Sequence, residues 1–125
     1  MTNKYNHITE DNIKLLVDQF YTKIRQNPQL SAIFERAIGE NESDWSPHLG
    51  KMYDFWSSVM LKSGRYHGTP MQKHMALPPF DLSLFDKWLE LFLQTANEIY
   101  TDDIAAQYYA KSSNIARSLK LGITH

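Results

Sequence analysis

One histidine, His74, lies in a segment whose flanking residues predict a short helix over residues 70–77. Thr69 can cap the start of this helix, and Pro70 suits its first position. The two prolines at 78–79 prevent the helix from continuing. Because a helix of about two turns is not stable alone in water, we expect something else in the molecule to cover its apolar side.

The predicted chemistry of this short helix depends on what surrounds the imidazole. Met71, Met75 and Leu77 lie on the same side as His74 and give that side an apolar character. A large planar ligand gripped by the histidine would cover them, and neutral imidazole is the usual protein ligand of haem iron. The alternative is an ordinary surface histidine beside Lys73.

A second histidine, His48, is predicted to lie on another helix. Met52 and Trp56 follow it at spacings of four and eight, so the three side chains share one helical face, with Phe55 beside them. His48 is either a histidine of the helix start or part of a pocket.

Tyr21 and Trp88 each allow two interpretations. Both lie on or beside apolar helical stripes, where an aromatic residue usually belongs to the core. A buried phenol hydroxyl or indole N–H needs a partner, however, and either group can point a donor into a cavity.

The elements that position these residues are predicted to be helices throughout. Apolar residues recur at helical spacing in nearly every segment, and no alternating stretch predicts a sheet. The predicted helices begin at Thr9, after Asn27-Pro28, at Ser43, at Asp81 or Ser83, and at Thr101. We therefore expect an all-α protein with one domain over residues 1–125.

Composition excludes several classes of function. The chain has 125 residues, a net charge of −1 and no basic patch, which argues against a nucleic-acid partner. It has no apolar run long enough to span a membrane and no secretory signal at its start, so we expect a cytoplasmic protein. The absence of cysteine excludes disulfides and haem attached through Cys-x-x-Cys-His. Motifs for di-iron, zinc-protease and phosphate-binding sites are also absent.

Taken together, several segments resemble a truncated haemoglobin, most closely group III. The resemblance covers nearly the whole chain, and its specificity comes from the order and spacing of the segments. The glycine pairs typical of groups I and II are missing. The matching segments are Phe20-Tyr21, Ile33-Phe34, Trp45 to Trp56, Phe55 to Ser58, Gly64 to His74, and Phe85 to Leu89.

The resemblance implies a two-over-two helical sandwich around haem b, with His74 as the iron ligand. Tyr21 and Trp88 match the distal pair that donates hydrogen bonds to a bound ligand, and His48 matches the histidine at the distal entrance. The residues expected to contact the cofactor are Phe34, His48, Met52, Phe55, Trp56, Met71, His74 and Leu77. Lys51, Arg65, Tyr66, His67 and Lys73 remain alternatives for the haem propionates.

The implied function is binding of oxygen, nitric oxide or carbon monoxide, for oxygen storage, scavenging or sensing. The alternative is a nitric oxide dioxygenase or a peroxidase-like enzyme. Because the chain has no flavin or nicotinamide motif, such an enzyme would need a redox partner. A helical interaction module that has lost the cofactor is a third interpretation.

Overall fold

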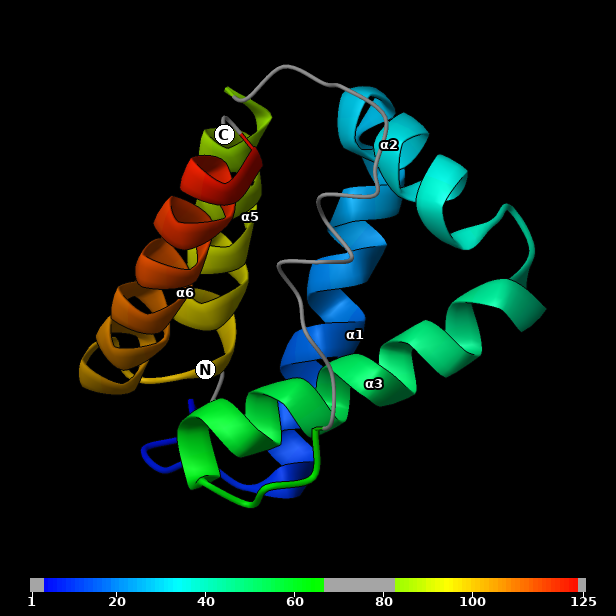
Figure 1. Ribbon diagram of the computed structural model, residues 1–125. Helices are drawn as coiled ribbons and strands as arrows, with labels where there is room; N and C mark the ends of the chain where they lie inside the picture. The colour runs from blue at the N-terminus through cyan, green and yellow to red at the C-terminus, as the bar shows by residue number, and fades with distance from the viewer. Residues whose placement is uncertain (1–3, 67–82, 124–125) are drawn as a thin grey trace.

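The computed structural model describes residues 4–66 and 83–123 (Figure 1). These residues form helices and no strand, which confirms the predicted all-α class. The helices are α1 (Glu10–Gln26), α2 (Pro28–Ile38), α3 (Glu42–Leu61), α5 (Leu84–Ile99) and α6 (Asp102–Ile123). The predicted helix over 70–77, with Met71, His74, Met75 and Leu77, lies outside the described residues.

Helix α1 begins and ends at polar residues that satisfy the free backbone groups of a helix end. Thr9 and Asn12 form a capping box, in which each side chain accepts a hydrogen bond from the other residue's backbone N–H, at 3.1 and 2.8 Å. At the other end, the Asn27 side chain caps α2 by accepting from Gln29 and Leu30. Pro28 then occupies the first turn of α2, where its missing N–H costs nothing.

The core is centred on α1. Its apolar stripe, predicted from spacing, is fully buried: Ile13, Leu16, Val17, Phe20 and Ile24. Figure 1 shows α1 in the middle of the molecule, with α3 crossing it and α5 alongside, and with α6 packed on the outer side of α5. The pairs α1/α3 and α5/α6 therefore form the two layers of the predicted sandwich.

The start of α3 differs from the prediction by one residue. The helix begins at Glu42 rather than Ser43, with Asn41 preceding it. Pro47, which the sequence predicted near the first turn, lies inside the helix, and it has no N–H to donate to the carbonyl one turn earlier. The Asn41 N–H donates to the Asp44 carboxylate at 3.3 Å, which ties down this first turn.

The segment before α1 is bound to the turn between α5 and α6. The Tyr5 N–H donates to the Ile99 carbonyl and the Thr101 N–H donates to the Tyr5 carbonyl, both at 2.9 Å. Beneath them the Tyr100 hydroxyl donates to Asn12 Oδ1 at 2.7 Å and lies 3.0 Å from the Tyr108 hydroxyl. Apolar periodicity did not predict this buried polar cluster. None of the described helices could cross a membrane.

Candidate haem pocket

Tyr21 lies near the end of α1 among aromatic side chains from α2 and α3. Its ring centroid is 5.1 Å from that of His48, 5.8 Å from Phe34 and 5.9 Å from Trp45. The His48 ring stands almost perpendicular to it, at 88°. The structure thus brings together three residues that the sequence predicted for one site, Tyr21, Phe34 and His48.

The Tyr21 hydroxyl is a donor held in an apolar environment. The side chain is buried, and this burial raises the pKa of the phenol well above its usual value, so that it keeps its proton. Within residues 4–66 and 83–123 this hydroxyl makes no hydrogen bond to another residue. A phenol hydroxyl can donate one hydrogen bond, so this one is available to a group that is not among the described residues.

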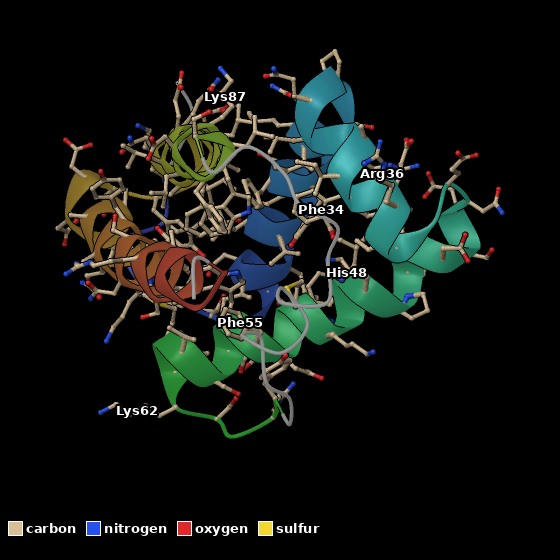
Figure 2. The ribbon with its side chains drawn as sticks, turned by 45° about the horizontal axis from the view of Figure 1, so that its top comes forward. Phe34, Arg36, His48, Phe55, Lys62 and Lys87 are labelled. Carbon is tan, nitrogen blue, oxygen red and sulfur yellow. The ribbon has the colours of Figure 1, made fainter. Side chains whose placement is uncertain are left out.

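Half-buried apolar side chains lie beside Tyr21 on α2 and along α3. Phe34, Met52 and Phe55 all pack against the edge of the core and keep part of their surface uncovered. In Figure 2, Phe34, His48 and Phe55 lie on the sides of their helices that face the middle of the molecule, whereas Lys62 and Lys87 point away from it. A flat apolar ligand would find a matching surface here.

Trp45 is part of this site, although sequence reasoning assigned it no role. Its side chain is 1% exposed, and its ring lies 6.0 Å from His48 and 6.3 Å from Phe34. The indole N–H donates to the Gly39 carbonyl at 3.0 Å, and the Arg25 guanidinium lies 4.8 Å above the ring. Its spacing, one helical turn before His48, was the available signal.

The residue whose carbonyl accepts the indole N–H, Gly39, has a backbone conformation that requires glycine. It ends α2 with a φ of +126°, a region that favours glycine. A Cβ at this position would stand 2.3 Å from the Asp44 carboxylate. The turn between α2 and α3 is therefore compact, and it holds Trp45 against Tyr21 and His48.

Trp88 occupies the other side of the same aromatic cluster. On α5 its indole stacks on Phe92, with centroids 5.6 Å apart and planes 2° from parallel. Its edge meets the Phe20 ring at 5.5 Å, and Phe20 in turn contacts Tyr21 at 5.1 Å. Trp88 is half-buried. Phe20 thus connects the two predicted distal donors, which come from different helices.

Trp56 lies deeper than the other predicted site residues. It is buried, stacked on Phe92 at 4.9 Å and in contact with Tyr108 at 5.8 Å. These contacts place it in the core between α3, α5 and α6. Its expected contact with the cofactor remains a prediction.

The end of α3 is fixed by hydrogen bonds to the start of α1. The Ser57 hydroxyl lies 2.5 Å from a Glu10 carboxylate oxygen and 2.6 Å from the Ser63 hydroxyl. Arg65, a candidate for the propionates, lies 3.5 Å from the same carboxylate. The Tyr66 N–H donates to the Ser58 hydroxyl at 2.9 Å, and its ring packs on Phe55 at 5.2 Å. These bonds fix the end of α3 and the segment that follows it as far as Tyr66. His67 and Lys73 lie outside the described residues.

The comparisons with known proteins agree with this geometry. The family model for bacterial-like globins matches residues 3–118. The chain is 34% identical over 113 residues to the group 3 truncated hemoglobin ctb of Campylobacter jejuni, which covers 90% of this chain and 89% of the relative. The crystal structure of a group III truncated hemoglobin from Campylobacter jejuni matches with a TM-score of 0.93 and 32% identity, covering 97% of this chain and 95% of the other.

The chain belongs to the bacterial-like globin family. Within that family it is a group III truncated haemoglobin, as the sequence predicted. It is accordingly a haem-binding globin whose ligands are small diatomic molecules. The described residues fit that group, because they combine half-buried apolar side chains with a tyrosine hydroxyl that makes no hydrogen bond to any of the other described residues.

Proposed function

We propose that this protein holds haem b through His74 and binds oxygen in the pocket bounded by Tyr21, Phe34 and His48. When bound, the haem supplies an iron that takes up oxygen, nitric oxide or carbon monoxide reversibly. The observation that carries the proposal is the buried Tyr21 hydroxyl, which has no hydrogen-bond partner among the described residues. A polar ligand held in front of it would supply that partner.

The role of Tyr21 and Trp88 in this proposal is to donate hydrogen bonds to the ligand. Oxygen carries partial negative charge when it binds ferrous iron, and donors in a dry pocket stabilise that charge. Because its pKa is raised by burial, the Tyr21 phenol remains protonated and can donate throughout the neutral range. Phe34, Met52 and Phe55 are proposed to contact the haem and keep water away, and Met71 and Leu77 to contact its other side.

The infrared spectrum of the carbon monoxide complex tests these donors directly. Hydrogen bonds to the ligand weaken the carbon–oxygen bond, so Tyr21→Phe and Trp88→Phe should each move its stretching band to higher frequency. Phe92→Leu, which alters packing behind Trp88 without removing a donor, is the control and should shift the band less. A band that neither Tyr21→Phe nor Trp88→Phe moves would contradict the proposed donor pair.

His48 is proposed to gate the pocket rather than to bind the iron. It lies on the second turn of α3 with its ring against that of Tyr21. On this proposal, His48→Leu changes the rate of ligand association more than the rate of oxygen release. The unliganded ferrous protein should show a five-coordinate spectrum. A six-coordinate ferrous spectrum that His48→Leu abolishes would show instead that His48 binds the iron.

The proximal role of His74 is tested by replacing it with glycine. Loss of the only proposed iron ligand should remove the haem or change its ligation, and free imidazole added to His74→Gly should restore the parent spectrum. His7→Gly provides a matched control, because His7 is an exposed histidine near the chain start. Unchanged haem content and an unchanged ferrous spectrum in His74→Gly would rule out this ligand.

A catalytic role is the second candidate, because a set of strong donors favours slow oxygen release and therefore chemistry on the ligand. The reactions are nitric oxide dioxygenation or a peroxidase-like reaction, both with electrons from a separate reductase. Rapid mixing of the oxygen-loaded protein with nitric oxide distinguishes the roles. Stoichiometric nitrate, followed by re-reduction with a cellular reductase, supports the enzyme; slow reaction without re-reduction supports storage, scavenging or sensing.

A further inference from the structure

A continuous line of aromatic rings leads away from Trp88 through the core. Trp88 stacks on Phe92, and Phe92 stacks on Trp56 with centroids 4.9 Å apart and planes 18° from parallel. Trp56 then contacts the ring of Tyr108 at 5.8 Å. The line crosses from α5 to α3 and on to α6, joining three helices that are distant in sequence.

The line continues through two buried phenols to the surface. Tyr108 and Tyr100 stack at 4.9 Å, and their hydroxyls lie 3.0 Å apart. Tyr100 contacts the ring of Tyr5 at 6.4 Å. Tyr5 is 43% exposed, yet two backbone hydrogen bonds fix it beside Tyr100. One end of the line thus lies at the proposed pocket and the other in water.

The residue types in this line are suited to carrying an electron. Indole and phenol are the side chains that lose a single electron most readily, whereas the benzene ring of Phe92 serves only as a stacked spacer. We propose that the line Trp88–Phe92–Trp56–Tyr108–Tyr100–Tyr5 carries oxidising equivalents from the haem pocket to Tyr5. The proposal rests on the proposed haem site beside Trp88, and it adds a peroxide-driven activity with a defined surface exit.

The overall reaction is balanced with hydrogen peroxide as the oxidant. Each peroxide takes two electrons and two protons and leaves as two waters. The first electron comes from the protein's own Tyr5, which releases its proton to solvent and becomes a phenoxyl radical. Tyr5 of a second protein molecule reduces that radical by giving up an electron and a proton, and the restored Tyr5 then supplies the second electron in the same way. Each peroxide thus leaves one Tyr5 radical on each of two protein molecules, and the pocket takes up two protons. Two such radicals from two protein molecules can join by a carbon–carbon bond between their rings. Trp88, Trp56, Tyr108 and Tyr100 are each oxidised and then reduced again.

The hydrogen bonds of the buried phenols support their role as intermediate carriers. Tyr100 donates its proton to Asn12, so Tyr108 must be the donor in the bond between the two hydroxyls. A proton can therefore shift along this line when Tyr108 loses an electron, and return afterwards. Both side chains are fully buried, so neither hydroxyl can pass its proton directly to solvent. Tyr5, at the water end, is 43% exposed and can release its proton there when it is oxidised.

The experiment is to add hydrogen peroxide to the haem-loaded protein with a nitrone spin trap, and to locate the trapped radical by peptide mass spectrometry. Tyr109 is an internal control, because it is also 43% exposed but contacts none of the rings in the line. We expect severalfold more adduct on Tyr5 than on Tyr109. Tyr108→Phe and, independently, Trp56→Phe should lower the Tyr5 adduct severalfold and leave the Tyr109 adduct unchanged.

Each other outcome overturns a defined claim. Equal labelling of Tyr5 and Tyr109, or adduct on Tyr66 with Tyr5 unlabelled, would contradict the proposed route. Tyr5 labelling that survives both Tyr108→Phe and Trp56→Phe would do the same. The visible spectrum is recorded before peroxide is added. A protein that takes up no haem would contradict the proposed function. Equal adduct on Tyr5 and Tyr109 in a haem-loaded protein would contradict only the route.

Discussion

Two buried tyrosine clusters lie near opposite ends of α1, and they differ in where their hydroxyls go. Near the start of α1, Tyr100 and Tyr108 bond to each other and to Asn12. Near the end of α1, the Tyr21 hydroxyl has no hydrogen bond within the described residues, although aromatic rings surround it. The first cluster satisfies its polar groups internally, whereas the second leaves a donor for a ligand.

Structural and functional polar groups can therefore be distinguished in a core of this kind. A satisfied network stabilises the fold, and its loss should lower the free energy of unfolding. An unsatisfied donor lowers stability slightly and is retained for binding. Substitutions in the Tyr100–Tyr108 cluster should therefore lower the free energy of unfolding, whereas substitution of Tyr21 should change the rate of ligand release.

The largest loss of stability is expected for Asn12→Ala. This change removes a member of the α1 capping box and also the acceptor of the Tyr100 hydroxyl, so the free energy of unfolding should fall by about 2–3 kcal/mol. Urea unfolding of the haem-loaded protein measures it. Asn27→Ala removes a cap of α2 without touching the tyrosines and should cost only about 1 kcal/mol. Equal losses would mean that the tyrosine network adds nothing.

A smaller loss is expected for Tyr108→Phe, which removes one buried hydrogen bond worth about 1 kcal/mol. It should also change the response to alkaline pH. The pKa of Tyr108 is raised in the folded protein, whereas the phenol of the unfolded chain ionises near pH 10. Above pH 10 and below the folded pKa, the native state therefore binds more protons than the unfolded state does. Stability therefore falls as the pH rises above 10.

Denaturant titrations at pH 8 and pH 11 measure this alkaline response. Tyr108→Phe should lose less stability between the two values than the parent protein does, because the phenol that resists ionisation has been removed. Tyr109→Phe is the control, and its free energy of unfolding should fall between pH 8 and pH 11 as much as that of the parent protein does. A Tyr108→Phe variant with the full alkaline loss would show that the shifted phenol is not its source.

A still smaller effect is expected for Arg25→Ala. The guanidinium lies over Trp45 and pairs with Glu42 at 2.6 Å, but it is at the surface, so the loss should be about 0.5–1 kcal/mol. Lys23→Ala is the matched control, because it removes another surface ion pair near the same helix end, with Glu98, but no cation over an aromatic ring. If both variants lose the same stability, the contact with Trp45 contributes nothing measurable.

The smallest effect on stability is expected for Tyr21→Phe. The ring contacts are kept and no hydrogen bond within the described chain is lost, so the free energy of unfolding of the haem-free protein should stay within about 0.5 kcal/mol of the parent. The same urea titration checks it. A loss as large as that of Tyr108→Phe would reveal a structural partner for the Tyr21 hydroxyl.

The sequence predicted the parts of this molecule that depend on local spacing. The apolar stripe of α1, the cap at Thr9 and the break at Asn27-Pro28 follow from periodicity and capping chemistry. The family resemblance then assembled Tyr21, Phe34 and His48 into one site, and their contacts agree with it. The start of α3 lies one residue before the predicted Ser43, and Pro47, expected near the first turn, lies inside the helix.

Long-range polar contacts were beyond sequence reasoning. Nothing in the spacing of Asn12, Tyr100 and Tyr108 indicates that they meet, because they come from three different helices or turns. The position of Trp45 under Arg25 likewise depends on the turn at Gly39, whose positive φ is visible only in the structure. Such contacts follow from how the helices pack, and helix packing is not encoded in any single stretch.

The rate of oxygen release, measured by stopped flow in Tyr21→Phe and Tyr108→Phe side by side, shows whether the Tyr21 hydroxyl donates to the ligand. Loss of a donor worth about 1.4 kcal/mol should speed oxygen release about tenfold in Tyr21→Phe, with a much smaller change in carbon monoxide release because that ligand is less polar. Tyr108→Phe should leave both rates unchanged. Equal acceleration of the two gases in Tyr21→Phe, or oxygen release that stays at the parent rate, would contradict the assignment of this hydroxyl to the ligand.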